Sequence, residues 1–421
     1  MSKKTHAMLV LTMALPMLTA TAQAATTIRV PQDRSTIQAA INGAADGDTV
    51  LVAPGTYHER IDFKGKTITV TSSDGPEKTF IDADFADSVV RFHGGETRYT
   101  VLSGFTLQNG KASQYPMNGG GVQIYESGPT IRGNVVQNNS ACGGSGISAE
   151  RSFAHIENNH IHHNSEDGCA SGNIGGGLLI GERNGEYSVQ VNDNLVEYNH
   201  ANMDGGGIGM VGSGYPSVYN NTIRFNISGG RGGGVSIAND SIPSFTNNAV
   251  YGNTSTAGGG IALSVASGAF GGYYNNNTVA NNQAAQGSEL YTTGFAATVR
   301  LKNNIFFTSK GTTSLACDDL YQPVSPIFRS NDVYATNGAV IGGVCAAAAG
   351  EKGNVAVDPL FIGTGEGVKA YALAAGSPAI DAGLGTSPYV ETDLMGHRRR
   401  IDGDGDGRRQ FDLGAIEYRP H

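Results

Sequence analysis

Charged and aromatic side chains recur at one position of a repeated motif, Asn-x-aliphatic-x-x-Asn. The residue two places before the second Asn is, in six successive copies, Gln137, His162, Glu197, Arg224, Tyr251 and Ala280. If the copies lie on stacked strands, these residues form one row at intervals of about 4.8 Å. The row then places a base, an anion, a cation and an aromatic ring within mutual reach.

This combination suits the eliminative cleavage of a uronate sugar. In that reaction a cation neutralises the substrate carboxylate while a base removes the proton on the adjacent carbon. We therefore predict that Arg224 or His162 supplies these functions, and that Glu197 orients them. Tyr251 is a candidate sugar contact, because the chain has no tryptophan to stack on sugar rings. The alternative is an exposed ladder of opposite charges, worth about 0.2–1 kcal/mol per pair.

A second group of charged residues follows the glycine-rich strands of the same repeats: Glu126, Glu150, Arg151, Glu182, Arg183 and Asp240. Carboxylates on neighbouring coils would lie about 5 Å apart, and those two coils apart about 9.6 Å, which brackets the separations in retaining and inverting glycosidases. Glu150, Arg151, Glu182 and Arg183 are therefore candidate substrate-binding residues, and glycoside hydrolysis by stacked carboxylates is a further alternative activity. The other interpretation is that these charges only solvate turns.

An acidic loop near the C-terminus carries a third pattern. Asp402, Asp404 and Asp406 alternate with glycine, and Asp412 follows. Aspartates at positions one, three and five, with glycine at six, begin a calcium-binding loop. Position twelve is Leu413 rather than glutamate, so the loop is not an EF-hand, and Asp412 is the candidate to close the ligand shell. We predict a Ca²⁺ site here, with a solvated acidic turn as the alternative.

The elements that must position these residues follow from the repeat. Between residues 119 and 310, glycine clusters and Asn hexads recur about every 25 to 31 residues, with apolar and polar residues alternating between them. Short strands joined by Gly and Asn turns at this period predict an all-β solenoid whose equivalent strands pair in parallel. Stacked asparagines can bond to one another along the axis. The bore is predicted to hold the aliphatic column Val136, Ile161, Val196, Ile223, Val250 and Val279.

Composition limits the function classes. The 421 residues include 61 glycines, 15% are charged, and the net charge is −9. Glycine at about twice its ordinary usage, without a three-residue period, excludes collagen. The 17 Tyr and 15 Phe exclude a disordered chain. An acidic chain has no global attraction to nucleic acid or anionic membranes, so a polyanionic substrate needs a local basic patch or a bridging cation.

The first 24 residues predict export. Lys3 and Lys4 precede an apolar stretch that is too short to span a bilayer, and residues 22–24 form a small-x-small cleavage signal. We find no later membrane-spanning segment. In an exported chain the four cysteines can form disulfides, and we predict the pairs Cys142–Cys169 and Cys317–Cys345. The predicted organisation is a signal peptide (1–24), a parallel β-helix (25–310), and last coils with a C-terminal tail and acidic loop (311–421).

The ends of the chain carry a family resemblance. Residues 35–44 predict a short amphipathic helix, capped by Asp33 or Ser35, that covers the apolar end of the solenoid. Residues 35–41, 47–50 and 54–57 resemble the N-terminal cap of right-handed parallel β-helix proteins of the pectin-lyase-like superfamily. Residues 358–361, 376–383 and 411–417 resemble the choice-of-anchor Q type of tail on secreted bacterial β-helix proteins. The resemblance implies the fold but no single activity, since the superfamily holds lyases, hydrolases, esterases, epimerases and adhesins.

We therefore expect a secreted or cell-surface (or periplasmic) bacterial protein that binds or eliminatively cleaves an acidic polysaccharide. If it is an enzyme, it is expected to be a pectate-lyase-like polysaccharide lyase. The alternative is a non-catalytic surface or adhesion scaffold. We expect a monomer that binds no nucleic acid and has no membrane span.

Overall fold

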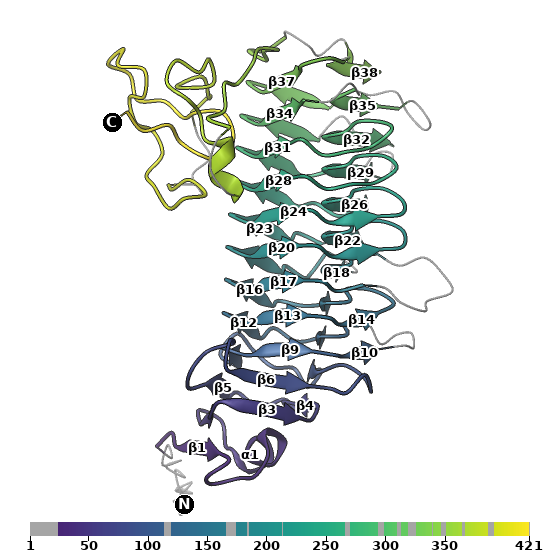
Figure 1. The fold of residues 1–421 in the computed structure, drawn as a ribbon, viewed down its shortest axis with the longest axis vertical. Coiled ribbons are helices and arrows are strands. Elements are labelled where there is room, and N and C mark those ends of the chain that lie inside the picture. The colour runs from purple at the N-terminus through teal and green to yellow at the C-terminus, as the bar shows by residue number, and fades with distance from the viewer. Residues whose placement is uncertain are drawn as a thin grey trace, which may run out of the picture.

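The computed structural model describes residues 24–112, 119–165, 174–182, 185–212, 214–265, 270–293, 299–309, 313–318, 326–338, 340–346, 351–363, 367–385 and 391–420. The chain winds into coils stacked along one axis, and equivalent strands of successive coils pair in parallel (Figure 1). Three long sheets of 12, 11 and 11 strands form the walls. This is the parallel β-solenoid that the repeat predicts.

Each coil contributes one strand to each wall, and the walls are named here in chain order within a coil. The first sheet comprises β1 (Thr27–Val30), β2 (Thr49–Val52), β5 (Thr69–Ser72), β8 (Val101–Ser103), β12 (Thr130–Arg132), β16 (His155–Glu157), β19 (Gln190–Asn192), β23 (Ser217–Tyr219), β27 (Ser244–Thr246), β30 (Tyr273–Asn275), β33 (Arg300–Lys302) and β36 (Ile327–Arg329). The second sheet comprises β3 (Gly55–His58), β6 (Thr79–Asp82), β9 (Thr106–Gln108), β13 (Val135–Gln137), β17 (His160–His162), β20 (Leu195–Glu197), β24 (Thr222–Arg224), β28 (Ala249–Tyr251), β31 (Thr278–Ala280), β34 (Ile305–Thr308) and β37 (Asp332–Ala335).

The third sheet holds the glycine-rich strands. It comprises β4 (Ile61–Asp62), β7 (Val90–Phe92), β11 (Val122–Tyr125), β15 (Ile147–Glu150), β18 (Leu178–Glu182), β22 (Ile208–Gly212), β26 (Val235–Asn239), β29 (Ile261–Val265), β32 (Leu290–Thr293), β35 (Leu315–Cys317) and β38 (Ile341–Gly343). Two small sheets pair β10 (Lys111–Ala112) with β14 (Ser140–Ala141) and β21 (His200–Ala201) with β25 (Ile227–Ser228). In the part of the chain that the structure describes, the named helices are α1 (Ile37–Gly43) and the 3-10 helix η2 (Gly367–Tyr371).

The bore is filled as predicted. Every member of the aliphatic column on the second sheet is fully buried, from Val136 to Val279. Two columns of asparagine side chains run along the corners on either side of this sheet. Asn226 illustrates the pattern: its Nδ2 donates to Val196 O and to Oδ1 of Asn253, both at 3.0 Å, while its Oδ1 accepts from N and Nδ2 of Asn199 at 3.0 Å. The asparagines therefore satisfy buried backbone groups as well as turning the chain.

Glu289 ends one of these asparagine columns. Its buried carboxyl accepts from Nδ2 of Asn282 at 2.6 Å and from the Thr308 hydroxyl at 2.9 Å. Burial raises the pKa of Glu289 to about 8, although these hydrogen bonds act in the opposite direction. A carboxyl group in this position is neutral at the pH where an unfolded glutamate is ionised.

This pKa shift makes the stability of the fold fall as pH rises. The unfolded glutamate releases its proton near pH 4.3, whereas the folded one keeps it up to about pH 8, so stability is greatest below the lower value. We expect the wild-type chain to lose on the order of 3 kcal/mol through this group between about pH 5 and pH 8. Glu289→Gln, which mimics the neutral acid, should flatten that part of the profile in urea unfolding. Parallel profiles for the two proteins would contradict the prediction.

Helix α1 covers the N-terminal end of the bore, as predicted (Figure 1). Its buried face is Ile37, Ala40 and Ile41. The N-cap is Thr36, whose hydroxyl accepts from Ala39 N, so the predicted caps Asp33 and Ser35 are wrong by one to three positions. The next coil bonds to both ends of the helix. At the N-terminal end, the Glu59 carboxylate accepts from Ile37 N and Gln38 N. At the C-terminal end, Lys66 Nζ donates to Ile41 O, Asn42 O and Ala44 O.

Lys66 is therefore expected to stabilise the cap through the C-terminal carbonyls of α1. We predict that Lys66→Met lowers the free energy of unfolding by about 1–2 kcal/mol, because three carbonyls lose a charged donor next to the helix dipole. Thermal unfolding of Lys66→Met against Lys78→Met, an exposed lysine that pairs with Asp74, measures the effect. Equal melting temperatures for the two variants would show that Lys66 does not hold the helix.

The C-terminal tail, residues 351–420, folds back along the outside of the second sheet (Figure 1, yellow-green and yellow). A small apolar cluster joins the two: Ile305 of β34 packs with Leu373, Ala379, Ile380 and Leu413. The Arg399 guanidinium, which is buried, donates to Oδ1 of Asn247 and to Gly414 O, both at 2.7 Å. The tail is therefore a fixed part of the molecule.

The structure bears on the predicted disulfides and on the predicted lack of a membrane span. Cys317 and Cys345 form the predicted disulfide. The predicted partner of Cys142, Cys169, lies outside the described residues, as do residues 1–23 of the predicted signal peptide. Among the residues that the structure describes, neither helix has the length and hydrophobicity to cross a membrane.

Candidate active site

The second sheet places the predicted residues in one outward row. Gln137 pairs with His162, His162 with Glu197, Glu197 with Arg224, Arg224 with Tyr251, and Tyr251 with Ala280. The same register extends the row in both directions, beyond the residues that the sequence singled out. The complete row, called the second-sheet row below, is His58, Asp82, Gln108, Gln137, His162, Glu197, Arg224, Tyr251, Ala280, Phe307 and Tyr334.

Glu197 is the centre of a network within this row. One carboxylate oxygen accepts from Nε of Arg224 at 2.5 Å, and the other lies 2.8 Å from Nε2 of His160. Nη1 of Arg224 in turn donates to the Tyr251 hydroxyl at 3.1 Å. The Glu197 side chain is only 8% exposed, whereas that of Arg224 is 23% exposed. Glu197 therefore contacts Arg224, and the histidine that it contacts is His160, which the sequence prediction did not assign.

The protonation states follow from these contacts. Burial raises the pKa of Glu197, but the hydrogen bonds and charges of Arg224 and His160 outweigh it and leave that pKa below its usual value. Burial lowers the pKa of Arg224, but its bonds to Tyr251 and Glu197 outweigh burial and raise it. Burial, with the neighbouring charges of His160 and His163, lowers the pKa of His162 to about 4. At neutral pH the row therefore presents a carboxylate, a guanidinium and an uncharged imidazole.

A cavity of about 320 Å³ opens beside Arg224. Its floor and sides come from β20, β24 and β28 and from the corner between the first and second sheets, and its roof comes from the tail. The lining residues are Asp193, Asn194, Leu195, Asn220, Thr222, Arg224, Tyr251, Val368 and Leu394. A guanidinium with five donors, two of them engaged by Glu197 and Tyr251, thus faces a space large enough for a small ligand.

The tail roof was not predicted from the sequence. The Tyr371 ring of η2 packs on the Tyr251 ring with centroids 4.8 Å apart, and its hydroxyl accepts from Nδ2 of Asn281 at 3.5 Å. Gly367 starts η2 with φ +66, and a Cβ at this position would lie 3.2 Å from Nη1 of Arg224. The glycine therefore lets the tail backbone approach the arginine closely. Sequence reasoning also missed Asp193, which only the folded corner brings to the cavity.

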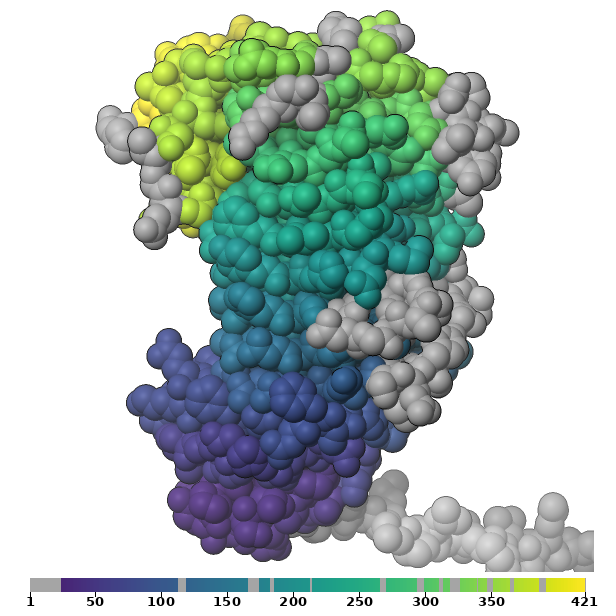
Figure 2. Space-filling view, turned by 45° about the vertical axis from the view of Figure 1, so that its right-hand side comes forward, coloured from purple at the N-terminus to yellow at the C-terminus, as the bar shows by residue number. Residues whose placement is uncertain are grey.

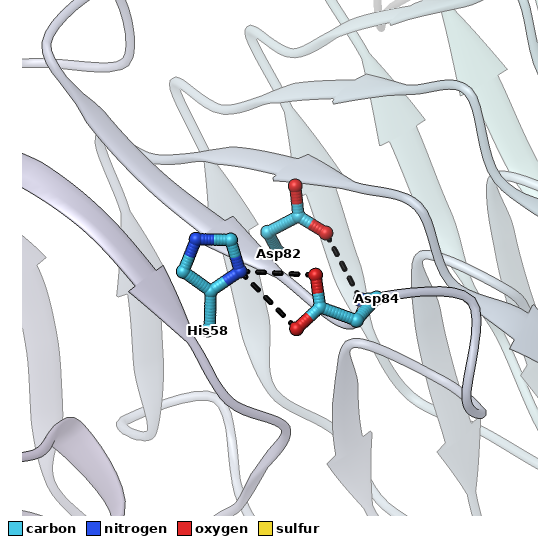
Figure 3. Close-up of side chains that lie close together, drawn as sticks. All are labelled: His58, Asp82 and Asp84. Atoms are coloured by element: carbon cyan, nitrogen blue, oxygen red, sulfur yellow. Dashed lines mark hydrogen bonds and ion pairs between the residues drawn. The ribbon is translucent and has the colours of Figure 1, made fainter.

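The N-terminal end of the second-sheet row carries a histidine with two aspartates (Figure 3). Nδ1 of His58 lies 3.0 Å from Oδ1 of Asp84, and ligand atoms of His58, Asp82 and Asp84 are all within 4.8 Å of one another. Asp82 Oδ2 also accepts from the amides of Gln108 and Asn109 at 2.8 Å. Burial raises the pKa of Asp82, but these hydrogen bonds outweigh it and lower that pKa. The cluster is thus anchored in the structure by amides from the next coil.

The second predicted group lies on the third sheet, away from the second-sheet row. Arg151 forms an ion pair with Glu126 at 2.8 Å and donates to the Tyr125 hydroxyl at 3.1 Å, with both charged side chains more than a third exposed. Glu150 pairs across the sheet with Tyr125 and Gly181, not with another carboxylate. Glu182 lies on β18, its side chain is not described, and Arg183 lies outside the described residues. No two described carboxylates are stacked here in the way that the glycosidase alternative needs.

The acidic loop is organised by backbone hydrogen bonds. Asp402 accepts from Gly405 N and Gly407 N, and Asp406 accepts from Arg408 N. Ligand atoms of Asp402 and Asp404 lie within 4.8 Å of Asp381, a residue that the calcium prediction did not include. Asp412 is buried and accepts from Asp381 N at 2.8 Å, but neither Asp412 nor Asp406, both predicted ligands, belongs to this group of three. The structure therefore groups Asp381, Asp402 and Asp404, a set of oxygen donors that suits Ca²⁺.

Calcium binding by this loop stays a prediction. We expect isothermal titration calorimetry to detect Ca²⁺ binding to the wild-type chain and to Asp406→Ala, and to lose it in Asp404→Ala. A ligand concentration of about 100 times Kd should add about 2.7 kcal/mol to the free energy of unfolding of the wild-type chain. Absence of Ca²⁺ binding by the wild-type chain, or retention of Ca²⁺ binding in Asp404→Ala, would contradict the prediction of a Ca²⁺ site in this loop.

Comparisons with known proteins place the fold. A family model described as "Right handed beta helix region" matches residues 61–223. No curated protein matches the sequence. The chain is similar to the solved structure of XylC with xylose, with 14% identity, a TM-score of 0.50, and coverage of 90% of this chain and 94% of that chain.

Two further solved structures are similar at lower TM-scores. Pectate lyase Pel9A is 14% identical with a TM-score of 0.45, covering 91% of each chain. A mannuronic acid specific polysaccharide family 6 lyase from human gut microbiota is 14% identical with a TM-score of 0.40, covering 76% of this chain and 83% of that chain. Taken with the stacked parallel coils and the family match, the likeness to XylC shows that the fold of this chain is a right-handed parallel β-helix.

Proposed function

We propose that this protein is a secreted β-helix protein that binds an acidic, uronate-containing polysaccharide along the second-sheet row and cleaves it by elimination. The observation that supports the proposal is the chain of contacts from His160 through Glu197 and Arg224 to Tyr251, with Arg224 facing a cavity. The likeness to XylC bears on the fold alone, so the proposal rests on the geometry and chemistry of this site.

In the proposed reaction Arg224 binds the carboxylate of one uronate residue. The negative charge that develops on this group when the adjacent carbon loses its proton is stabilised by the guanidinium, which Glu197 and Tyr251 hold in place before the substrate arrives. No water reorganisation is then needed during the step. Neutralising the carboxylate is also what makes the neighbouring C–H acidic enough to be removed.

His162 is the proposed base. Its low pKa of about 4 keeps the imidazole unprotonated at neutral pH, so it is ready to accept the proton from the carbon next to the carboxylate. The electron pair of the broken C–H bond forms a C=C bond, and the glycosidic C–O bond on the following carbon breaks. The departing oxygen takes a proton from solvent. The product is an unsaturated uronate at the new chain end.

The test is to incubate the protein with pectate, alginate and glycosaminoglycans, with and without Ca²⁺, and to follow the ultraviolet absorbance of the unsaturated product. Absorbance that rises on one polymer, and not with His162→Ala, supports elimination. Binding without product identifies the scaffold alternative, which keeps the polysaccharide partner but not the reaction. Hydrolysis products without unsaturation identify the glycosidase alternative.

A further inference from the structure

We propose that the C-terminal tail makes this site recognise the end of an acidic polysaccharide chain rather than its interior. This proposal rests on the proposed function, because it concerns how the same row takes its substrate. The argument depends on how much of the second-sheet row is open and on what closes it.

The N-terminal part of the row is open. The side chains of Gln108, Gln137 and His162 are half-buried and point outward from three successive coils, leading directly to Glu197 and Arg224. Nε2 of Gln137 donates to Oε1 of Gln108 at 3.1 Å, so the polar side chains already form a continuous line. A linear polymer laid along this line meets one polar side chain per coil, at intervals of about 4.8 Å.

The C-terminal part of the row is covered. Tyr251 is 4% exposed and Ala280, the next outward residue, is fully buried although it points away from the bore. Beyond it, Phe307 packs edge-on against Phe361 of the tail with ring centroids 5.4 Å apart. The space-filling view shows the tail standing out from the stacked coils at the upper left, with the coil surface below it recessed (Figure 2). A polymer that follows the row from the N-terminal coils therefore meets a wall at Tyr251.

The tail that forms this wall is fixed to the coils by hydrogen bonds. Ala415 N donates to the Thr278 hydroxyl on β31 at 2.9 Å, and Gly414 N donates to Asn303 O at 2.8 Å. Leu384 N and O bond to the side chain of Asn303 at 3.0 and 3.1 Å. These contacts act together with the apolar cluster around Ile305 and the buried bonds of Arg399 described above. Lifting the tail to let a polymer pass would break all of them.

The cavity beside Arg224 lies where the open row meets the wall. Its volume of about 320 Å³ is at the lower end of the range for ligand pockets, about 300–1,000 Å³, which fits one sugar ring. Arg224 supplies the cation for a carboxylate, Asn220 and Thr222 supply groups that bond hydroxyls, and Val368 closes the far side with an apolar surface. A uronate at the reducing end fits these features, because the C4–O bond that joins it to the rest of the chain can break by elimination, whereas an internal one would have to turn away from the row at the tail.

The stoichiometry of binding tests this proposal. In calorimetry with uronate oligomers and with long polymers of the same sugar, end recognition predicts one protein molecule per polysaccharide chain at every length. Interior recognition predicts a number that rises with chain length, and this result would overturn the proposal while leaving the proposed function in place. No binding to any uronate oligomer or polymer would instead overturn the proposed function.

If the protein cleaves the polymer during the titration, the products give the same information. Release of short products with slow loss of solution viscosity supports end recognition, and rapid loss of viscosity overturns it. Val368→Trp, which fills the cavity from the tail side, is expected to weaken binding of short oligomers on the order of tenfold or more. Lys369→Ala, an exposed neighbour on η2, is the matched control, and thermal unfolding verifies that both variants keep the fold. Unchanged affinity in Val368→Trp would show that the end of the polysaccharide does not bind in this cavity, and this result would overturn the proposal.

Discussion

Replacing Arg224 by alanine is expected to reduce turnover of an acidic polysaccharide on the order of 10²–10³-fold, with a parallel loss of binding. Arg224 is the cation among the lining residues of the cavity, which also include the carboxylate of Asp193, and Glu197 and Tyr251 hold it in one orientation. The removal of one preorganised donor to a developing negative charge typically costs this much. The measurement is the initial rate of unsaturated product formation, together with Kd for an oligomer of the polymer that the protein cleaves.

Controls must separate this effect from unfolding. Arg224→Ala removes the guanidinium partner of the nearly buried Glu197 carboxylate and leaves it beside His160, and removing one member of a buried ion pair is itself destabilising. Arg224→Lys keeps the positive charge beside Glu197 but loses the planar fork of donors, so it should fold and recover only part of the activity. Arg132→Ala removes the same charge from an exposed site on the first sheet and should keep full activity. Full activity in Arg224→Ala would refute the role proposed for Arg224.

The largest effect on stability is expected for Asn226→Ala, at about 3–5 kcal/mol. The Asn226 amide makes four side-chain hydrogen bonds in the buried corner between the second and third sheets, and alanine leaves partners such as Val196 O without a donor. Each buried polar group left unsatisfied costs about 1–3 kcal/mol. Urea unfolding of the variant measures the loss.

Asn138 provides a matched control for Asn226. It is also an asparagine at a corner of a coil, but it is exposed and has φ +54. Asn138→Ala should cost only about 1–2 kcal/mol, the strain of alanine in a left-handed conformation. Equal losses for the two variants would mean that the buried column of asparagines contributes no more than the turn conformation does.

The fold and the register of the row could be predicted from the sequence because one local motif determines both. The Asn hexad marks the same place on every coil, so residues at equal offsets, such as Glu197 and Arg224, must pair across neighbouring strands. The glycine-rich strands have no such marker at their C-terminal ends. Glu150 and Arg151 are adjacent in sequence and therefore belong to different rows, which is why the second predicted group does not stack its carboxylates.

The tail could not be predicted in the same way. Its docking depends on single contacts between residues far apart in sequence, such as Arg399 with Asn247 and Tyr371 with Tyr251, and neither pair belongs to a periodic pattern. For the same reason the calcium prediction missed Asp381, which reaches the acidic loop only after the tail has folded. The helix cap at Thr36 was missed for a smaller reason, because neighbouring polar residues all resemble caps in sequence.

The stacking of coils between α1 and the tail makes the open part of the row adjustable in length. Each coil from β9 to β24 makes its main contacts with its two neighbours, and the asparagine side chains at each corner bond to the coils before and after their own. Insertion or deletion of one whole coil between β9 and β17, before the contacts of His160, Glu197 and Arg224 begin, would lengthen or shorten the distance from the cap to the wall by about 4.8 Å, without altering either end. Duplication of a single repeat could therefore change how many sugar residues are held, while Arg224 and the cavity remain the same.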